Sequence, residues 1–179
     1  MSNDQKQLQG FETEFRRYRL LAQSTIESMT YVQLQECAGG GNNSVEVLMQ
    51  HLGGNLRSRF TDFLTSDGEK DFRNRDREFE DQGLSEQGLH ELWDSGWQIL
   101  GDTLDGLQDA DFSRTVTIRG VAFTVAEALT RSLSHVAYHV GQIVLLARLQ
   151  QGEGWKSLTI PRGGSDAYRQ NPASERGPA

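Results

Sequence analysis

The sequence predicts an all-α protein, a four-helix bundle with a short β-hairpin between its third and fourth helices. Four segments repeat apolar residues every three or four positions, which is the period of one helix face. The stretch TVTIRGVAFT has β-favouring runs on both sides of a two-residue turn, which indicates a hairpin. A long charged connection and this hairpin separate the helices, so neighbouring helices need not simply alternate in direction.

The first two helices are predicted from their apolar stripes. The first covers about residues 5 to 35, after which Gly39, Gly40 and Gly41 interrupt the pattern. The second is expected to begin at Asn43, which has capping-box spacing to Glu46, and to end near Ser66. Its stripe consists of the following apolar side chains: Val45, Leu48, Leu52, Leu56, Phe60, Phe63 and Leu64.

The second half of the chain follows the same logic. Residues 67–83 mix both charge signs with almost no apolar content, so we expect an exposed connection with at most one helical turn. Within it Arg73, Arg75 and Arg77 could alternatively clamp a phosphate or an acidic ligand. A third helix is predicted over about 85–107, and the hairpin follows at 115–124 with its turn at Arg119-Gly120. Thr124 and Glu127 then form the T-x-x-E box that opens the fourth helix.

Length and composition bound the class of protein. A chain of 179 residues fits one domain, which we place at residues 1–160, followed by an irregular tail at 161–179. The net charge of −7 disfavours nucleic acid and an anionic membrane as partners. We expect no signal peptide and no membrane span, hence a cytoplasmic protein. The lone cysteine, Cys37, is expected to be a buried or semi-buried thiol rather than a nucleophile.

Three histidines carry the main chemical expectation. His135 and His139 are four residues apart on the predicted fourth helix, so both imidazoles can reach one ion. His51 borders the apolar stripe of the second helix and is the best third ligand. Three neutral imidazoles leave a coordination position open and suit Zn²⁺ or Ni²⁺. The alternative is that each of these three histidines is an ordinary residue at the border of the core. The fourth histidine, His90, is expected at the surface.

A family resemblance supports the metal interpretation. The stretches VLMQHLGGN and HVAYHVGQI resemble the DinB/YfiT-like superfamily of damage-inducible metal-binding bundles, over about residues 5–152. The charged segment after the second helix resembles that of one uncharacterised subgroup of the superfamily. The resemblance implies a homodimeric four-helix bundle with one divalent ion on His51, His135 and His139. It also implies chemistry with low-molecular-weight thiols such as bacillithiol, mycothiol or glutathione, or maleylpyruvate isomerisation in some members.

Two kinds of function follow from these expectations. An ion with an open position lowers the pKa of a bound water or thiol, which favours a transferase or hydrolase acting with a low-molecular-weight thiol on a small electrophile. The alternative is a non-enzymatic homodimer that the ion braces, with a stress-response or binding role. Gln142 could orient an imidazole or contact a substrate, while Asn55 and Arg59, one and two turns after His51, could contact an anionic substrate or simply face solvent.

Overall fold

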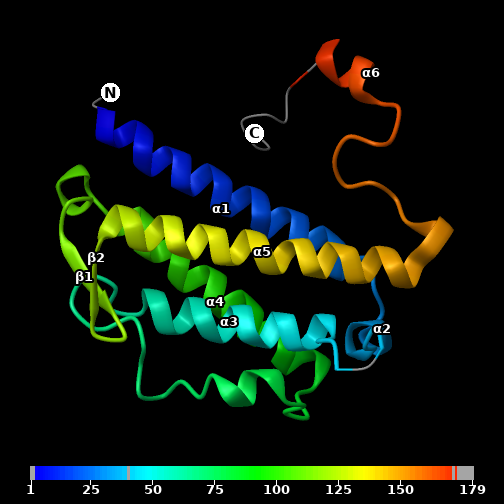
Figure 1. Ribbon diagram of the computed structural model, residues 1–179, viewed down its shortest axis with the longest axis horizontal. Coiled ribbons are helices and arrows are strands. Elements are labelled where there is room, and N and C mark those ends of the chain that lie inside the picture. Colours follow the sequence, from blue (N-terminus) through cyan, green and yellow to red (C-terminus); the bar gives the residue numbers. More distant parts are fainter. Residues whose placement is uncertain (1–2, 40, 171, 173–179) are drawn as a thin grey trace.

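The computed structural model describes residues 3–39, 41–170 and 172, and these residues form the predicted four-helix bundle (Figure 1). Its main helices are α1 (Asn3–Glu27), α3 (Val45–Phe60), α4 (Glu86–Gly106) and α5 (Val125–Gln151). The shorter elements are α2 (Tyr31–Gln35), α6 (Ser165–Gln170) and the 3₁₀ turns η1 (Asp76–Phe79), η2 (Asp109–Asp111) and η3 (Gly152–Gly154). Strands β1 (Thr115–Ile118) and β2 (Val121–Thr124) pair antiparallel between α4 and α5. The predicted fold class is confirmed.

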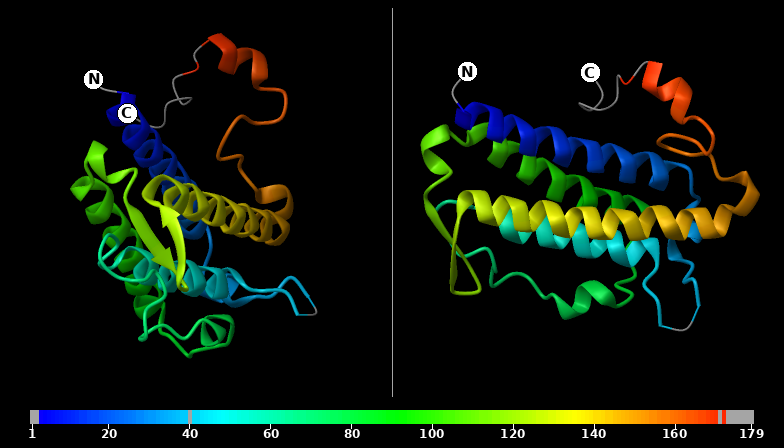
Figure 2. Two further views of the ribbon diagram at one scale, coloured as in Figure 1. Left: turned by 60° about the vertical axis from the view of Figure 1, so that its left-hand side comes forward. Right: turned by 45° about the horizontal axis from the view of Figure 1, so that its top comes forward.

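The four main helices surround one apolar core. Helix α1 packs along α5, α3 packs along α4, and α3 also contacts α5. Figures 1 and 2 show that α3 runs antiparallel to α5 and that the hairpin lies at the end of the bundle where α5 begins. The apolar stripes predicted from the sequence meet here, with Leu52, Leu56, Leu129 and Val136 fully buried. None of the helices formed by the described residues combines the length and apolarity that crossing a bilayer requires.

The hairpin and the start of α5 form for local reasons. Arg119 and Gly120 have φ angles of 55° and 72°, the left-handed pair of a type I′ turn, and Ile118 pairs with Val121 across it. Thr124 then caps α5 by accepting from the backbone N–H of Glu127, whose carboxylate accepts from the N–H of Thr124. Both features are as the sequence predicts.

The first predicted helix is wrong in one respect, because it is two helices rather than one. Helix α1 ends at Glu27, and α2 begins at Tyr31 behind its own N-cap, Thr30. The Thr30 side chain accepts from the N–H of Gln33, and the Gln33 side chain accepts from the N–H of Thr30. This capping box stabilises a new helix start, so the chain turns at residues 28–30 although the apolar pattern continues through Met29.

Smaller corrections apply to the second helix and to Cys37. The N-cap of α3 is Ser44, which accepts from the N–H of Val47, and not Asn43. The helix ends at Phe60, and turns that include Asp62 at a φ of 48° replace its predicted last turn. Cys37 follows α2 and is exposed, so the expectation of a buried thiol is wrong. Helix α6 occupies part of the predicted irregular tail, of which residues 171 and 173–179 lie outside the described residues.

The contact between α3 and α4 depends on glycine. A Cβ atom built on Gly96 would lie 2.7 Å from the carbonyl oxygen of Gly53, and one built on Gly53 would lie 2.8 Å from the carbonyl oxygen of Leu92. Both distances are too short for real atoms, so only residues without a side chain allow this approach of the two backbones. The close crossing fixes the position of α3, which carries His51.

Candidate metal centre

Three histidine side chains converge between α3 and α5. His51 comes from α3, whereas His135 and His139 lie one turn apart on the same face of α5. One ligand nitrogen of each residue lies within 4.8 Å of the other two, and the Nε2 atoms of His51 and His135 are 3.1 Å apart. Ligand nitrogens on one tetrahedral ion with bonds of ~2.1 Å are about 3.4 Å apart, so the cluster could hold one metal ion.

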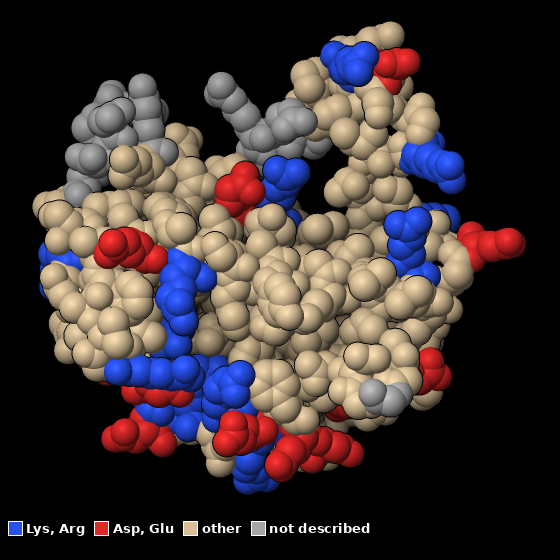
Figure 3. Space-filling view, viewed as in Figure 1, with Lys and Arg blue, Asp and Glu red and all other residues tan. Residues whose placement is uncertain are grey.

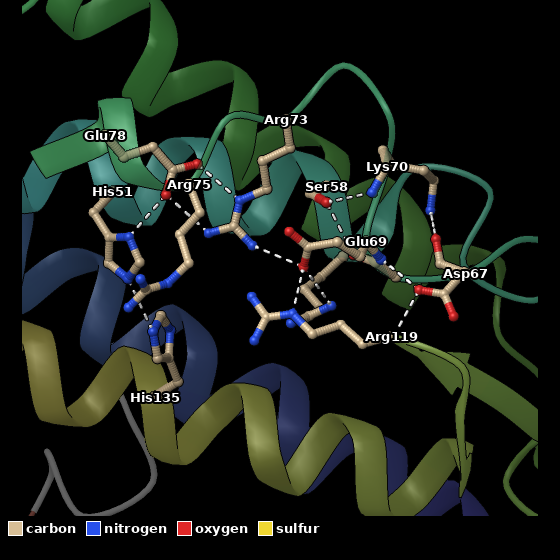
Figure 4. Close-up of polar contacts among 12 residues, drawn as sticks. His51, Ser58, Asp67, Glu69, Lys70, Arg73, Arg75, Glu78, Arg119 and His135 are labelled. Carbon is tan, nitrogen blue, oxygen red and sulfur yellow. Dashed lines mark hydrogen bonds and ion pairs between the residues drawn. The ribbon is translucent and has the colours of Figure 1, made fainter.

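A buried carboxylate orients the imidazole of His51. Oε2 of Glu78, in η1, lies 2.9 Å from His51 Nδ1, and the side chains of both residues are more than nine-tenths buried (Figure 4). Because an ionised carboxylate only accepts hydrogen bonds, Nδ1 carries the proton and Nε2 presents its lone pair to the cluster. This is the hydrogen-bonding arrangement that metal-ligating histidines ordinarily have.

Arg73 holds Glu78 in place. Its Nε and Nη2 atoms donate to the two carboxylate oxygens of Glu78, each at 2.8 Å, and the Arg73 side chain is 2% exposed. Burial alone would raise the pKa of Glu78, but the hydrogen bonds from Arg73 and His51 outweigh it and lower that pKa. The carboxylate therefore stays ionised as the acceptor for His51.

The role of Glu78 and Arg73 corrects the expectation that residues 67–83 form an exposed connection. The segment does contain just a single 3₁₀ turn, but Arg73 and Glu78 are buried against α3. Of the arginines considered as an anion clamp, Arg73 is bound to Glu78, Arg75 lines the cavity described below, and Arg77 is exposed. Phe79, an aromatic residue within the charged run, packs its ring against His51 at 4.6 Å between ring centroids, but Phe72 in the same run is exposed, so the sequence carried no clear signal of the buried part.

Gln142 orients the second imidazole. His139 Nδ1 donates to Oε1 of Gln142 at 2.8 Å, one turn further along α5. This contact leaves the Nε2 lone pair of His139 directed away from Gln142, as the Glu78 contact does for His51. His135 differs, since its Nδ1 is buried without a hydrogen-bond partner among the described residues.

The surroundings favour the neutral imidazoles of His135 and His139. Burial, followed by the fields of His139, His51, Arg73 and Arg59, lowers the pKa of His135 to about 3. Burial also lowers the pKa of His139, although its hydrogen bond to Gln142 acts in the opposite direction. A neutral imidazole is the form that binds a metal ion. The donor set, three imidazoles of which hydrogen bonds orient those of His51 and His139, thus fits a divalent ion.

The cluster faces a cavity of about 1020 Å³. Asn55 and Arg59, one and two turns after His51, both line it, as does Gln142. Its walls come from α3, the 67–83 segment, the hairpin and α5, so residues far apart in the sequence enclose it. His90 is half-buried on α4 and is not part of the cluster. The arrangement therefore offers three ligands and room for a small molecule beside them.

Fold and site together define the class, a helical bundle with a buried three-histidine cluster between two of its helices. The chain belongs to the DUF1572 family, described as a protein of unknown function, whose model matches residues 2–164. Searches of the curated proteins and of the solved structures find no match.

Proposed function

We propose that this protein is a divalent-metal-dependent transferase or hydrolase of the DinB/YfiT-like superfamily, with His51, His135 and His139 as its metal ligands. The observation that carries the proposal is the 3.1 Å separation of the His51 and His135 Nε2 atoms, with His139 close to both and a cavity beside them. Imidazole ligands favour Zn²⁺ or Ni²⁺ over Mg²⁺ or Ca²⁺.

The protein supplies three ligands and no obvious fourth. Within the described residues, the cluster that could hold an ion contains the three histidines alone, and Glu78 is occupied by His51 and Arg73. Three protein ligands with an open position are the arrangement of catalytic zinc sites, whereas structural sites are closed by four. This favours a reactive site over a purely bracing one.

The chemistry of such a site is nucleophile activation. An ion held by His51, His135 and His139 would act as a Lewis acid and lower the pKa of a water or a thiol, so that a nucleophile would be available near neutral pH. The residues of the chain do the remaining work. Glu78 and Gln142 fix the tautomers of His51 and His139, and the cavity walls hold the second reactant close to the ligands. A low-molecular-weight thiol and a small electrophile are the reactants we propose.

Metal content and turnover together test this function. The protein is purified without added metal, its metal content is measured, and a thiol such as glutathione is offered with a generic electrophile. Stoichiometric metal with thiol-dependent or hydrolytic turnover, both lost in His135→Ala and kept in His90→Ala, supports the proposal. An ion that raises thermal stability without any turnover would instead favour a bracing role, because a structural metal stabilises the fold without reacting.

A further inference from the structure

Arginine side chains gather at one end of the cavity. Arg59 from α3, Arg119 from the hairpin turn and Arg131 from α5 all line it. Burial lowers the pKa of Arg59 to about 10, against the opposing field of Glu69, and the fields of Arg119 and Arg131 add to the decrease. The three arginines thus come to one cavity from three separate elements, and Arg59 and Arg119 share the carboxylate of Glu69.

These arginines outnumber the carboxylates that face them. Oε2 of Glu69 is shared by Arg119 Nε at 3.1 Å, Arg73 Nη1 at 3.5 Å and Arg59 Nη1 at 3.6 Å. Arg131 has no carboxylate partner among the described residues and lies 5.9 Å from the centre of the Phe123 ring. Figure 3 shows several Lys and Arg side chains close together in the lower part of this face, with Asp and Glu side chains beside and below them. The charged lining of the cavity consists of five arginines and the carboxylate of Glu127, which accepts from the N–H of Thr124, so positive charge is in surplus there.

The two helices place this charge at a defined distance from the histidines. On α3, His51, Asn55 and Arg59 follow one another at intervals of four residues, and on α5 the order is Arg131, His135 and His139. Because α3 and α5 are antiparallel, the end of α3 and the start of α5 both lie near the hairpin (Figure 1). Arg59 and Arg131 are therefore on the hairpin side of the histidines on their own helices. Four helical residues rise by about 6 Å, so the backbone of Arg131 lies about one turn from that of His135, and the backbone of Arg59 about two turns from that of His51.

Uncharged hydrogen-bonding residues line the cavity between the three histidines and the three arginines. Asn55 is 7% exposed and Ser132 is 6% exposed, and both line the cavity. The Oγ atom of Ser132 is buried and has no hydrogen-bond partner among the described residues. A hydroxyl that is this well buried ordinarily has a partner, so the place of Ser132 in the cavity lining favours a polar ligand there.

We propose that the cavity binds a small organic anion whose carboxylate or phosphate group contacts Arg59, Arg119 and Arg131, while Asn55 and Ser132 hydrogen-bond its uncharged part. Guanidinium groups bind both oxyanions through paired hydrogen bonds. Arg131 is one turn from His135 and Arg59 is two turns from His51, so a ligand that reaches from these arginines to the imidazoles spans on the order of 6–12 Å along the helices. The inference rests on the proposed function in placing the reacting atom of the ligand at the three histidines.

Calorimetric titration at constant ionic strength tests the anion site, because screening by salt weakens exposed charges. The probes are succinate and inorganic phosphate, which separate a carboxylate site from a phosphate site, and uncharged succinamide is the control ligand. Arg131→Gln removes an exposed guanidinium near the start of α5. The control, Arg148→Gln, removes an exposed guanidinium from the last turn of the same helix. Arg119→Asn is a second variant, since asparagine tolerates the φ of 55° at this turn position.

We expect at least one anion to bind the wild type and Arg148→Gln alike, and to bind Arg131→Gln and Arg119→Asn about tenfold or more weakly. Succinamide should not bind. Equal affinities in wild type and Arg131→Gln, or no binding of either anion to a wild type that holds its ion, would overturn the inference. Metal content is measured on the same samples: its absence from the wild type refutes the proposed function, whereas its retention in Arg131→Gln with weaker anion binding supports both proposals.

Discussion

The carboxylate of Glu78 lies 2.9 Å from Nδ1 of His51, across 27 residues of sequence, and both side chains are buried. This contact joins the charged segment after α3 to the three-histidine cluster, and it fixes which nitrogen of His51 faces the cluster. It also explains why this segment packs against the bundle, since Arg73 and Glu78 neutralise each other there.

Removal of the Glu78 charge should weaken metal binding. In Glu78→Gln the side chain keeps its size but no longer stabilises the protonated Nδ1 of His51 as strongly, so we expect metal affinity to fall about 10–100-fold. Competition with a chromophoric chelator measures this affinity. Glu80→Gln, two residues away and exposed, is the matched control and should bind metal like the wild type. An unchanged affinity in Glu78→Gln would show that this contact does not tune the site.

A side chain at Gly54 should disturb the contact between Glu78 and His51 by steric overlap alone. A Cβ atom at this position would overlap Oε1 of Glu78, whose carboxylate is held by Arg73 and has little freedom to move. We therefore expect Gly54→Ala to displace Glu78 from His51 and to lower metal affinity. In the double variant Gly54→Ala/Glu78→Gln the two losses should not add, because both act on one interaction. Fully additive losses would place the effect of Gly54 elsewhere.

A side chain at Gly96 should destabilise the bundle, because α3 and α4 cross closely there. Gly96→Ala forces a Cβ atom against the backbone of Gly53, and overpacking of this kind costs about 1–3 kcal/mol. Gly101→Ala on the same helix meets no atom within 4 Å and should stabilise the protein by up to about 1 kcal/mol through helix propensity. Urea unfolding compares the two variants. A Gly96→Ala protein as stable as Gly101→Ala would contradict the close crossing.

Asp67 should make stability depend on pH in the acid range. Its carboxylate accepts from the N–H groups of Glu69, Arg119 and Gly120 at 2.7 to 2.8 Å and so ties the 67–83 segment to the hairpin turn. Burial would raise the pKa of Asp67, but these hydrogen bonds outweigh it and hold the pKa well below its usual range.

The sign of the effect follows from this lowered pKa. The stabilisation is fully present above the unfolded-state pKa of about 3.9 and is lost as the pH falls from there through the lower pKa of the folded state. We expect Asp67→Asn to reduce the free energy of unfolding by on the order of 1 kcal/mol at pH 7, with a difference from wild type that shrinks below about pH 4. Urea unfolding between pH 3 and 7 measures it, and a difference independent of pH would contradict the assignment.

The parts of the fold that could be predicted are those formed by residues close together in the sequence. The turn at Arg119-Gly120 and the capping box of Thr124 and Glu127 each involve residues close in sequence, and both form as predicted. The break at Thr30 was missed because the apolar period carries on across it and shows only which residues face the core. The Thr30 and Gln33 pair was the local sign of a new helix start.

The site was predictable only in part, for a different reason. The spacing of His135 and His139 places both on one face of α5, and the apolar stripe of α3 places His51 beside the core, so these three could be named from the sequence. Glu78 and Arg73 could not, because a charged residue is buried only when its partners are, and these partners are distant in sequence. Mixed charge therefore indicated an exposed segment, whereas the charges are paired inside.

Metal content of the purified protein tests the central claim most directly. Wild type, His51→Ala, His139→Ala and His90→Ala are expressed alike, purified without added metal and analysed by inductively coupled plasma mass spectrometry. The account predicts about one divalent ion per chain in wild type and His90→Ala, and a content far below this in the two cluster variants. Full occupancy in His51→Ala, or a wild type without any bound ion, would contradict it.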